Sequence, residues 1–161
     1  MSGAPDLAAR IQRLEDVEAI RLLKAAYCNG LDGGWDPKGP SHMGAVADLF
    51  TDDGVWDGTP WAPRSEGREA IRQMLVGYGV VPWIVHVVTN PVIDVRGDEA
   101  DGHWHVIVAT ETVDGVPQLI CGTYDEKYAR TPEGWRFRSL TFTSAGLADQ
   151  VSGWRNGPPP T

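Results

Sequence analysis

The sequence predicts an α+β fold, in which a curved antiparallel sheet wraps around N-terminal helices and forms a cone-shaped cavity. Helical periodicity dominates the first half of the chain, whereas strand-like segments follow one another through the second half. The turns between those segments are short, and one of them, "VDGV", carries the Asp-Gly pair that favours a hairpin. Helices followed by a meander of strands are typical of domains in which the helices cover one face of the sheet.

The chain is expected to be helical from Asp6 to about Leu31. Apolar residues recur there every three or four positions, which is the spacing of a helix with one buried face. The phase of this pattern shifts at residues 15–17, so two consecutive helices are predicted instead of one straight rod. Asp16 would cap the second helix, and the Gly-Gly pair at residues 33–34 would end it.

The middle of the chain is expected to alternate short elements with loops. The long loop "LDGGWDPKGPSHMG", which contains His42, is interpreted as a cap over the cavity mouth or as a linker. A short helix near residues 45–50 and a short strand in "DGVWDG" follow, and then the loop "TPWAPR". Ser65 is predicted to cap a third helix from about Glu66 to Tyr78.

Four strands are predicted in the second half of the chain. They are rich in β-branched and aromatic residues and span residues 83–95, 102–113, 116–130 and 135–145. No internal repeat is visible. We therefore expect a single domain over residues 1–150 and a flexible proline-rich tail at residues 151–161.

The composition narrows the classes of partner. The chain has 161 residues, with 14 basic and 22 acidic side chains, a formal net charge of −8 and no basic run. Nucleic acid and membrane surfaces are therefore not expected as partners. Cys28 and Cys121 are too few for a disulfide framework, and neither a signal-peptide pattern nor an apolar run that could span a bilayer is visible. The expectation is a soluble cytoplasmic protein.

One histidine is unusual in its surroundings, in the segment "PWIVHVVTNP". Side chains alternate along a strand, so His86 shares a face with Ile84, Val88 and Asn90. An imidazole on a buried apolar face loses free energy unless its nitrogens find partners. The rest of the fold must therefore supply a polar partner for His86.

Asp32, at the end of the N-terminal helical segment, is the partner that the sequence favours. A carboxylate at a helix C-terminus is disfavoured by the helix dipole, and an inward-facing imidazole would compensate it. Such a pair fixes the tautomer of the histidine and makes its outer nitrogen a base. The competing interpretation is a solvated Asp32 and a structural core histidine, and spacing alone leaves both open. Tyr27 continues the apolar row of the helix, so its ring is expected to point inward.

Several segments together resemble a known family. They are "IQRLEDVEAIRLLKAAYCNGLD", "ADLFTDDGVWDG", "EGREAIRQML", "HVVTNPVIDV" and "GWRFRSL". These segments are similar to the SnoaL-like branch of the nuclear-transport-factor-2-like superfamily, and the resemblance extends from about Ala8 to Ser144. It implies a cystatin-like α+β barrel. The superfamily contains dehydratases, isomerases, cyclases, dehydrochlorinases and non-catalytic subunits, so the fold alone does not give the function.

The resemblance also implies site residues. Dehydratase and dehydrochlorinase members carry an aspartate near the end of this helix and a histidine in this strand, which correspond to Asp32 and His86. A tyrosine five residues before the aspartate, found in the bile-acid dehydratases, corresponds to Tyr27.

The dehydrochlorinase members add the pattern Tyr-x-x-x-Tyr-x-Arg, which "YDEKYAR" matches with Tyr124, Tyr128 and Arg130 on one strand face. Those members have a lysine at the position of Tyr27. This departure argues against halide elimination.

The function that the resemblance implies is a cofactor-independent lyase, a dehydratase that removes water from a hydrophobic cyclic substrate of steroid or polyketide type. His86, oriented by Asp32, would remove a proton, and Tyr27 would act as the acid. Arg130 would stabilise negative charge at the pocket rim or hold acidic neighbours. The residues expected to bind substrate are Trp56, Asn90, Tyr124 and Tyr128.

No cofactor or metal ion is expected, and a homodimer or homotrimer is implied by the resemblance. The alternatives are an isomerase or cyclase that uses the same cavity, a non-catalytic binding module, and the small subunit of a ring-hydroxylating dioxygenase. His103 and His105 are two residues apart on a predicted strand, so their side chains lie on the same face. We favour a position at the surface or at a subunit contact for them over a metal site. The aspartates at residues 52, 53 and 57 are interpreted as turn and helix-end residues rather than a cation site.

Overall fold

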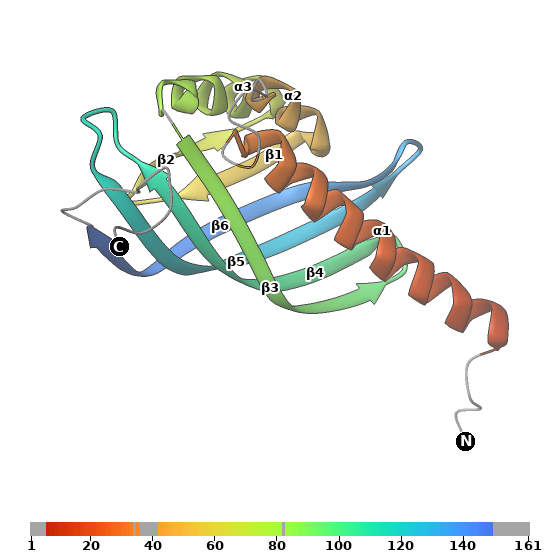
Figure 1. The fold of residues 1–161 in the computed structure, drawn as a ribbon. Coiled ribbons are helices and arrows are strands. Elements are labelled where there is room, and N and C mark those ends of the chain that lie inside the picture. Colours follow the sequence, from red (N-terminus) through yellow and green to blue (C-terminus); the bar gives the residue numbers. More distant parts are fainter. Residues whose placement is uncertain (1–5, 34, 36–41, 82, 150–161) are drawn as a thin grey trace.

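A computed structural model of the chain describes residues 6–33, 35, 42–81 and 83–149. Its helices are α1 (Leu7–Leu31), α2 (Met43–Val46) and α3 (Arg68–Gly77), with the short 3-10 helices η1 (Ala47–Leu49) and η2 (Tyr78–Val80). Its strands are β1 (Phe50–Gly58), β2 (Ala62–Glu66), β3 (Trp83–Arg96), β4 (Glu99–Glu111), β5 (Pro117–Thr131) and β6 (Gly134–Asp149). The described strands form one six-stranded sheet in the order β2-β1-β6-β5-β4-β3 (Figure 1).

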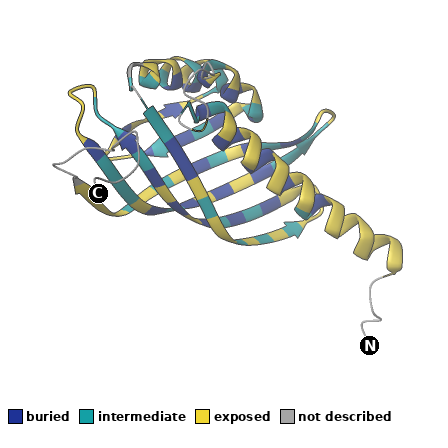
Figure 2. Ribbon diagram, in the orientation of Figure 1, coloured by how far each residue is buried: buried dark blue, intermediate teal, exposed yellow. Residues whose placement is uncertain are grey.

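The sheet is strongly curved, and the helices lie against its concave face. α1 crosses the strands diagonally, while α2 and α3 sit together at one end of the sheet (Figure 1). Along the long strands, buried positions that face the helices alternate with more exposed positions on the outer face (Figure 2). The predicted α+β architecture is confirmed, and the four long predicted strands correspond to β3, β4, β5 and β6.

One pairing in the sheet differs from the prediction. β1 pairs with β6 in parallel, so the sheet is mixed, although every other pairing among the described strands is antiparallel. β2 and β3 are the two edges of the sheet. The sheet therefore curls around the helices without closing into a barrel.

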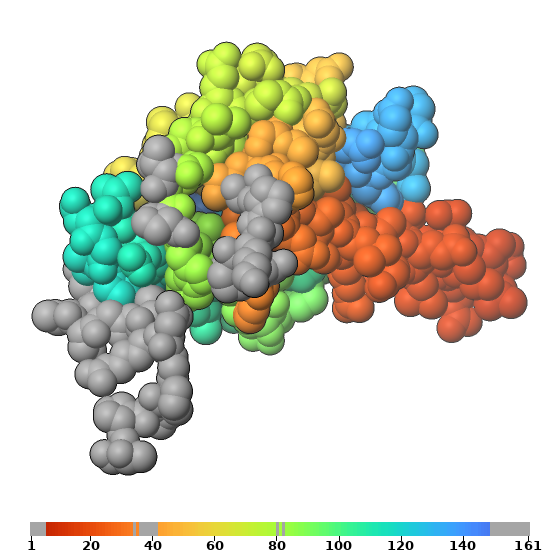
Figure 3. Space-filling model, turned by 45° about the horizontal axis from the view of Figure 1, so that its top comes forward, coloured from red at the N-terminus to blue at the C-terminus, as the bar shows by residue number. Residues whose placement is uncertain are grey.

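α1 is one continuous helix, so the predicted break near Asp16 is wrong. Asp16 lies within the helix and is buried, where it accepts hydrogen bonds from Gln12, Arg130 and Trp135. The shift in the apolar pattern has a different cause, because the N-terminal half of α1 protrudes from the rest of the molecule (Figure 3). The apolar side chains exposed on that half are Leu7, Ile11 and Leu14.

The segment before α3 also differs from the prediction. Part of the predicted loop "TPWAPR" belongs to strand β2, in which Ser65 pairs with Trp56 of β1. α3 begins at Arg68 after Gly67, whose φ of +85° lies in the region that favours glycine. Ser65 is therefore a strand residue and does not cap the helix. The hairpin of β1 and β2 was missed because "TPWAPR" contains two prolines, which are typical of loops.

The core is a layer of apolar side chains between the helices and the concave face. Its most deeply buried members include Ile20, Tyr27, Phe50, Ile71, Phe137 and Leu140. Among the described helices, none is long and apolar enough to cross a membrane. The proline-rich tail predicted at residues 151–161 lies outside the described residues.

Candidate active site

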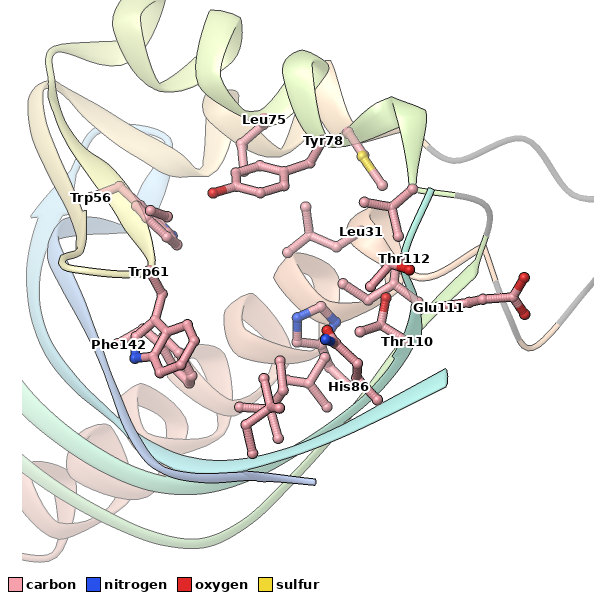
Figure 4. A pocket seen from close by; sticks show the side chains of 18 of the residues that line it. Leu31, Trp56, Trp61, Leu75, Tyr78, His86, Thr110, Glu111, Thr112 and Phe142 are labelled. Carbon is pink, nitrogen blue, oxygen red and sulfur yellow. The ribbon is translucent and has the colours of Figure 1, made fainter. Parts of the chain in front are cut away.

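A cavity of about 430 Å³ lies between the concave face of the sheet and the helices. This volume is within the range of small-molecule binding sites. The wall is mostly apolar, and side chains converge on the cavity from both the helical layer and the sheet (Figure 4). Its polar groups include Tyr27, Tyr78, His86, Thr110, Glu111 and Gln118. No lysine or arginine of the described part of the chain lines it.

His86 and Asp32 meet at the wall of this cavity. Nδ1 of His86 lies 2.7 Å from Oδ1 of Asp32, and only 5% of the His86 side chain and 2% of the Asp32 side chain are exposed. A carboxylate accepts hydrogen bonds, so this contact puts the proton of the neutral ring on Nδ1 and leaves a lone pair on Nε2. The ring of His86 lines the cavity beside Thr110 (Figure 4). The contact that the sequence predicts is therefore present.

Local structure fixes the orientation of this carboxylate. Asp32 follows the last residue of α1 in an extended conformation and donates its backbone N–H to the carbonyl group of Cys28. Its Oδ1 atom also accepts the backbone N–H of His86 at 2.9 Å, and its Oδ2 atom accepts the indole N–H of Trp35 at 2.9 Å. Both oxygens of Asp32 are thus engaged, which holds the imidazole in one orientation.

Tyr27 is buried on α1, and its side chain forms part of the cavity wall. The indole N–H of Trp56 donates to the Tyr27 hydroxyl oxygen at 2.9 Å. Burial raises the pKa of Tyr27 above its usual value, and the hydrogen bond from Trp56 opposes that rise. Tyr27 therefore stays protonated at neutral pH, where it is suited to donate a hydrogen bond.

Cys28 is the only cysteine close to this pair in the described residues, and it is unsuited to act as a nucleophile. Burial raises the pKa of the Cys28 thiol to about 12. Since the thiolate is the reactive form, a thiol with this pKa is inert at neutral pH.

A buried ion pair beneath the cavity escaped the sequence prediction. Nζ of Lys24 lies 2.5 Å from Oε1 of Glu126, and both side chains are fully buried. The ammonium group also lies 3.5 Å from the ring centroid of Tyr124, a residue of the cavity wall. The spacing contained the signal, because Lys24 lies four residues after Ile20 and three before Tyr27 on the buried face of α1. Glu126 likewise occupies an inward-facing position of β5 between two tyrosines.

Of the residues predicted to bind substrate, Trp56 and Tyr124 line the cavity. Tyr128 shares the inner face of β5 with Tyr124, as alternation predicts, but it does not line the cavity. Four residues of strand separate the two by about 13 Å. There Tyr128 accepts the indole N–H of Trp104 at 3.1 Å and donates to Glu126. These contacts indicate a structural role for Tyr128. The prediction failed because alternation gives the face on which a side chain lies but not its distance from the site.

Arg130 lies still further along β5, so its predicted place at the pocket rim is wrong. Its guanidinium group donates to Asp16 at 2.8 Å and to Asp98 at 2.9 Å, and it stacks over the ring of Trp135. The alternative prediction, that Arg130 holds acidic neighbours, describes these contacts. Arg130 ties α1 to the turn between β3 and β4.

Asn90 does not share the cavity with His86 because β3 contains a bulge. The register of β3 against β4 shifts between Thr89 and Val92, and Asn90 has a φ of 52°. A bulge interrupts the alternation of faces, so Asn90 is exposed and its amide group lies 3.1 Å from Nδ1 of His105.

His103 and His105 lie on the outer face of the sheet, at the surface position that was favoured. Nδ1 of His103 lies 2.7 Å from Oδ1 of Asp125, and these side chains are 41% and 62% exposed. Within the described ranges, no group of three or more histidine, cysteine, aspartate or glutamate side chains is arranged to hold a metal ion.

Asp52, Asp53 and Asp57 all lie in strand β1, so their interpretation as turn and helix-end residues is wrong. The carboxylate of Asp57, near the end of the strand, accepts the backbone N–H of Thr59 at 3.0 Å.

Half of the loop that was interpreted as a cap lies outside the described residues, so that role stays a prediction. Leu31 and Met43, near its two ends, line the cavity. His42 donates its backbone N–H to the carbonyl group of Gly30 at 3.1 Å.

Solved structures share this fold. A candidate aromatic ring hydroxylase from Novosphingobium aromaticivorans is 27% identical with a TM-score of 0.75, over 86% of this chain and 95% of that chain. A candidate scytalone dehydratase from the same organism is 22% identical with a TM-score of 0.74, over 86% of this chain and 89% of that chain. A hexachlorocyclohexane dehydrochlorinase, LinA type 2, is 21% identical with a TM-score of 0.78, over 93% of this chain and 98% of that chain. At such identities, the last two similarities establish the fold alone.

No curated protein sequence matches the chain. The SnoaL-like domain family, in contrast, matches it over residues 12–141, which is most of its length. This match covers α1, the helices at the end of the sheet and the strands up to the middle of β6. The resemblance identified in the sequence is therefore confirmed, and the chain belongs to the SnoaL-like domain family.

Proposed function

We propose that the protein is a cofactor-independent lyase, and more narrowly a dehydratase that removes water from a hydrophobic cyclic compound of steroid or polyketide type. The observation that carries this proposal is the buried His86–Asp32 pair at the wall of a mostly apolar cavity. A histidine held by a carboxylate is a suitable general base, and a dry site strengthens its polar interactions. Two of the structural neighbours bear the names of elimination enzymes, which is the same class of reaction.

In the proposed reaction, Nε2 of His86 removes a proton from a carbon next to a carbonyl group. The electron pair of that C–H bond moves into an enolate, whose oxygen or departing β-hydroxyl group accepts a hydrogen bond from Tyr27. The enolate then forms the C=C bond while the C–O bond to the β-hydroxyl group breaks. The departing hydroxyl group takes from the imidazolium the proton that His86 removed, while Tyr27 donates a hydrogen bond to it, and it leaves as water. His86 thereby returns to its neutral form.

The magnitudes decide which substrates suit this site. A positioned general base contributes about 10²–10⁴-fold in rate, and a well-placed hydrogen-bond donor to the oxyanion contributes about 10²–10³-fold. Together they suffice for a proton that a carbonyl group already acidifies, but not for an unactivated carbon. The carbonyl group is therefore part of the proposal.

The charges of the cavity wall favour an uncharged substrate. Glu111 is the only carboxylate among the described lining residues, and His86 is the only basic side chain there. A charged substrate group other than the oxyanion that Tyr27 binds would be left uncompensated in an apolar site, which costs free energy. A neutral ring system with one carbonyl and one hydroxyl group fits better.

An isomerase or cyclase is the nearest alternative, because the same base could return the proton to another carbon. In ketosteroid isomerase, a carboxylate base beside a tyrosine performs such a proton shift. The two reactions differ in their products, since only the dehydratase releases water and forms a new C=C bond.

A second candidate function is that of a subunit of an aromatic ring hydroxylase. The observation in its favour is the 27% identity to the candidate ring hydroxylase. A subunit without chemistry of its own would need a larger partner and would tolerate substitution of His86. An enzyme would act alone and would not tolerate it.

The experiment that tests the proposal is a turnover assay with a panel of neutral cyclic β-hydroxy ketones. The enone product is followed by its ultraviolet absorbance, and exchange of the α-proton with D₂O is followed by NMR. The purified wild type is compared with His86→Gln and with His103→Gln, a matched control on the outer face.

We expect enone formation by the wild type and by His103→Gln, and a loss of about 10²–10⁴-fold in His86→Gln. Deuterium exchange without enone would move the assignment to an isomerase. Equal rates in wild type and His86→Gln, or no turnover and no exchange with any member of the panel, would contradict the proposal.

A further inference from the structure

The contact between Trp56 and Tyr27 has a fixed direction. An indole nitrogen can only donate a hydrogen bond, whereas a phenol group can donate or accept. Because Nε1 of Trp56 lies 2.9 Å from the Tyr27 hydroxyl oxygen, that oxygen must accept. The proton of Tyr27 is then directed away from Trp56.

The ring of Tyr27 has little freedom to change this arrangement. Tyr27 is 1% exposed, and three aromatic rings surround it at steep interplanar angles of 63° to 78°. These rings belong to Phe50, Tyr124 and Phe137. Since the ring is held by packing, the torsion of the hydroxyl group is its remaining degree of freedom. Two polar groups lie beside this hydroxyl group, the indole N–H of Trp56 and the hydroxyl group of Tyr124. A tyrosine hydroxyl can donate or accept, whereas the indole can only donate, so Trp56 is the neighbour that fixes the direction of the torsion.

The position of the Trp56 ring is also built into the fold. Trp56 is buried in β1, where it pairs with Ser65 of β2 and Leu140 of β6. Gly58 lies two residues further along the strand, and a Cβ atom there would come within 2.5 Å of the Trp56 ring. The absence of a side chain at Gly58 therefore makes room for the indole.

We propose that Trp56 is a positioning residue for Tyr27, which turns the hydroxyl proton of Tyr27 into the cavity and strengthens it as a donor to a substrate oxygen. This inference rests on the proposed function, in which Tyr27 binds the enolate or the departing hydroxyl group. A donor on the phenol oxygen polarises the O–H bond, so the proton that faces the cavity becomes a stronger hydrogen-bond donor. Trp56 acts through Tyr27 and need not touch the reacting atoms.

The test is the binding of 2-naphthol, an apolar bicyclic phenol whose ionised oxygen stands in for the enolate oxygen. Its absorbance spectrum distinguishes the neutral from the ionised form, so titrations below and above the pKa of naphthol measure the affinity of the cavity for each form. The variants are Trp56→Phe, Tyr27→Phe and the double variant. The matched control is Trp104→Phe, because Trp104 is also buried and also donates its indole N–H to a tyrosine, but to Tyr128 outside the cavity.

We expect Trp56→Phe to weaken binding of the naphtholate by about fivefold to tenfold, the value of one net hydrogen bond, with little change for neutral naphthol. In the turnover assay the same variant should lower kcat by a similar factor and leave KM nearly unchanged. Added to Tyr27→Phe, it should have no further effect on naphtholate binding. Trp104→Phe should bind naphtholate as the wild type does.

Unchanged naphtholate affinity in Trp56→Phe would overturn the inference, as would an undiminished effect in the Tyr27→Phe background or no naphtholate binding by the wild type. If Trp56→Phe fails to fold, Gly58→Ala displaces the indole instead and should weaken naphtholate binding in the same direction. If these binding results hold but the panel of hydroxy ketones gives no turnover, the proposed function fails while the role of Trp56 stands.

Discussion

Within the described residues, two histidine–aspartate pairs have the same contact distance in different environments. Nδ1 lies 2.7 Å from Oδ1 both in His86–Asp32, on the inner face of the sheet, and in His103–Asp125, on the outer face. The inner side chains are 5% and 2% exposed, whereas the outer side chains are 41% and 62% exposed. The contact is the same in both, so it cannot by itself define a site.

What differs is the surroundings of each pair. Water and ions screen the outer pair, and pairs of this kind contribute little to stability or orientation. The inner pair is held from a second side, because Asp32 also accepts the backbone N–H of His86. Only His86 adjoins an apolar cavity with a tyrosine hydroxyl donor in its wall. Burial and the cavity therefore turn a common contact into a candidate base.

The largest expected effect is on the orientation of His86, the proposed base. Asp32→Asn keeps the size of the side chain but removes the carboxylate that holds the Nδ1 proton, so turnover should fall by about 10²–10⁴-fold. Asp125→Asn makes the same change in the outer pair and should leave turnover unchanged. Steady-state kinetics on the best substrate of the panel measures both. Similar losses in the two variants would contradict the contrast between the pairs.

The ion pairs of two lysines, Lys24 and Lys127, show the same contrast between a buried and an exposed contact. Lys24→Met leaves Glu126 as an unpaired buried charge, so the free energy of unfolding should fall by about 3–5 kcal/mol. Lys127 pairs with Asp101 at 3.8 Å on the exposed face, and Lys127→Met should cost less than about 1 kcal/mol. Urea denaturation of both variants gives the two values. Equal losses would show that burial does not decide the strength of these pairs.

Asp16 is an intermediate case, because its carboxylate is buried while its partner Arg130 is partly exposed. Arg130, Trp135 and Gln12 lower the pKa of Asp16 through their hydrogen bonds. A lowered folded-state pKa stabilises the fold above the unfolded pKa of about 3.8, and this stabilisation is lost as the pH falls through the folded value. Asp16→Asn should therefore cost about 1–3 kcal/mol at pH 7 and less in acid. Thermal unfolding from pH 7 to pH 3 tests this, and a cost that does not shrink in acid would refute it.

The smallest expected effect is the loss of protein stability when the outer pair is broken. Asp125→Asn should change the free energy of unfolding by less than about 1 kcal/mol, and by less still at high salt. Denaturation at low and high ionic strength provides the measurement. If Asp125→Asn lowered the free energy of unfolding as much as Asp32→Asn does, exposure would not weaken the outer pair.

Two simple rules made the inner pair possible, and the family resemblance favoured it over a structural core histidine. Helical spacing places Asp32 at the end of α1, and alternation places His86 on the inner face of β3. The same alternation failed four residues later, at Asn90, because a bulge resets the face of the strand. A bulge of this kind has no clear signature in a single sequence.

The sequence also could not predict how far along a strand the cavity extends. Tyr124, Tyr128 and Arg130 do share one face of β5, but only Tyr124 reaches the cavity. Where the cavity ends depends on α1 crossing the sheet, which no local pattern encodes. Lys24 and Asp16 escaped for a related reason, because polar side chains on a helix are expected at caps or in solvent unless a partner across the fold is known.

The central claim is that Asp32 holds the neutral His86 ring with its proton on Nδ1 and its lone pair on Nε2, facing the cavity. The most direct test is 15N NMR of the ring nitrogens, recorded for the wild type and for Asp32→Asn, with His103 as the internal reference. The account predicts the Nδ1–H tautomer for neutral His86 in the wild type and a shift toward Nε2–H in Asp32→Asn, with His103 the same in both proteins. Neutral His86 as the Nε2–H tautomer in the wild type would contradict it.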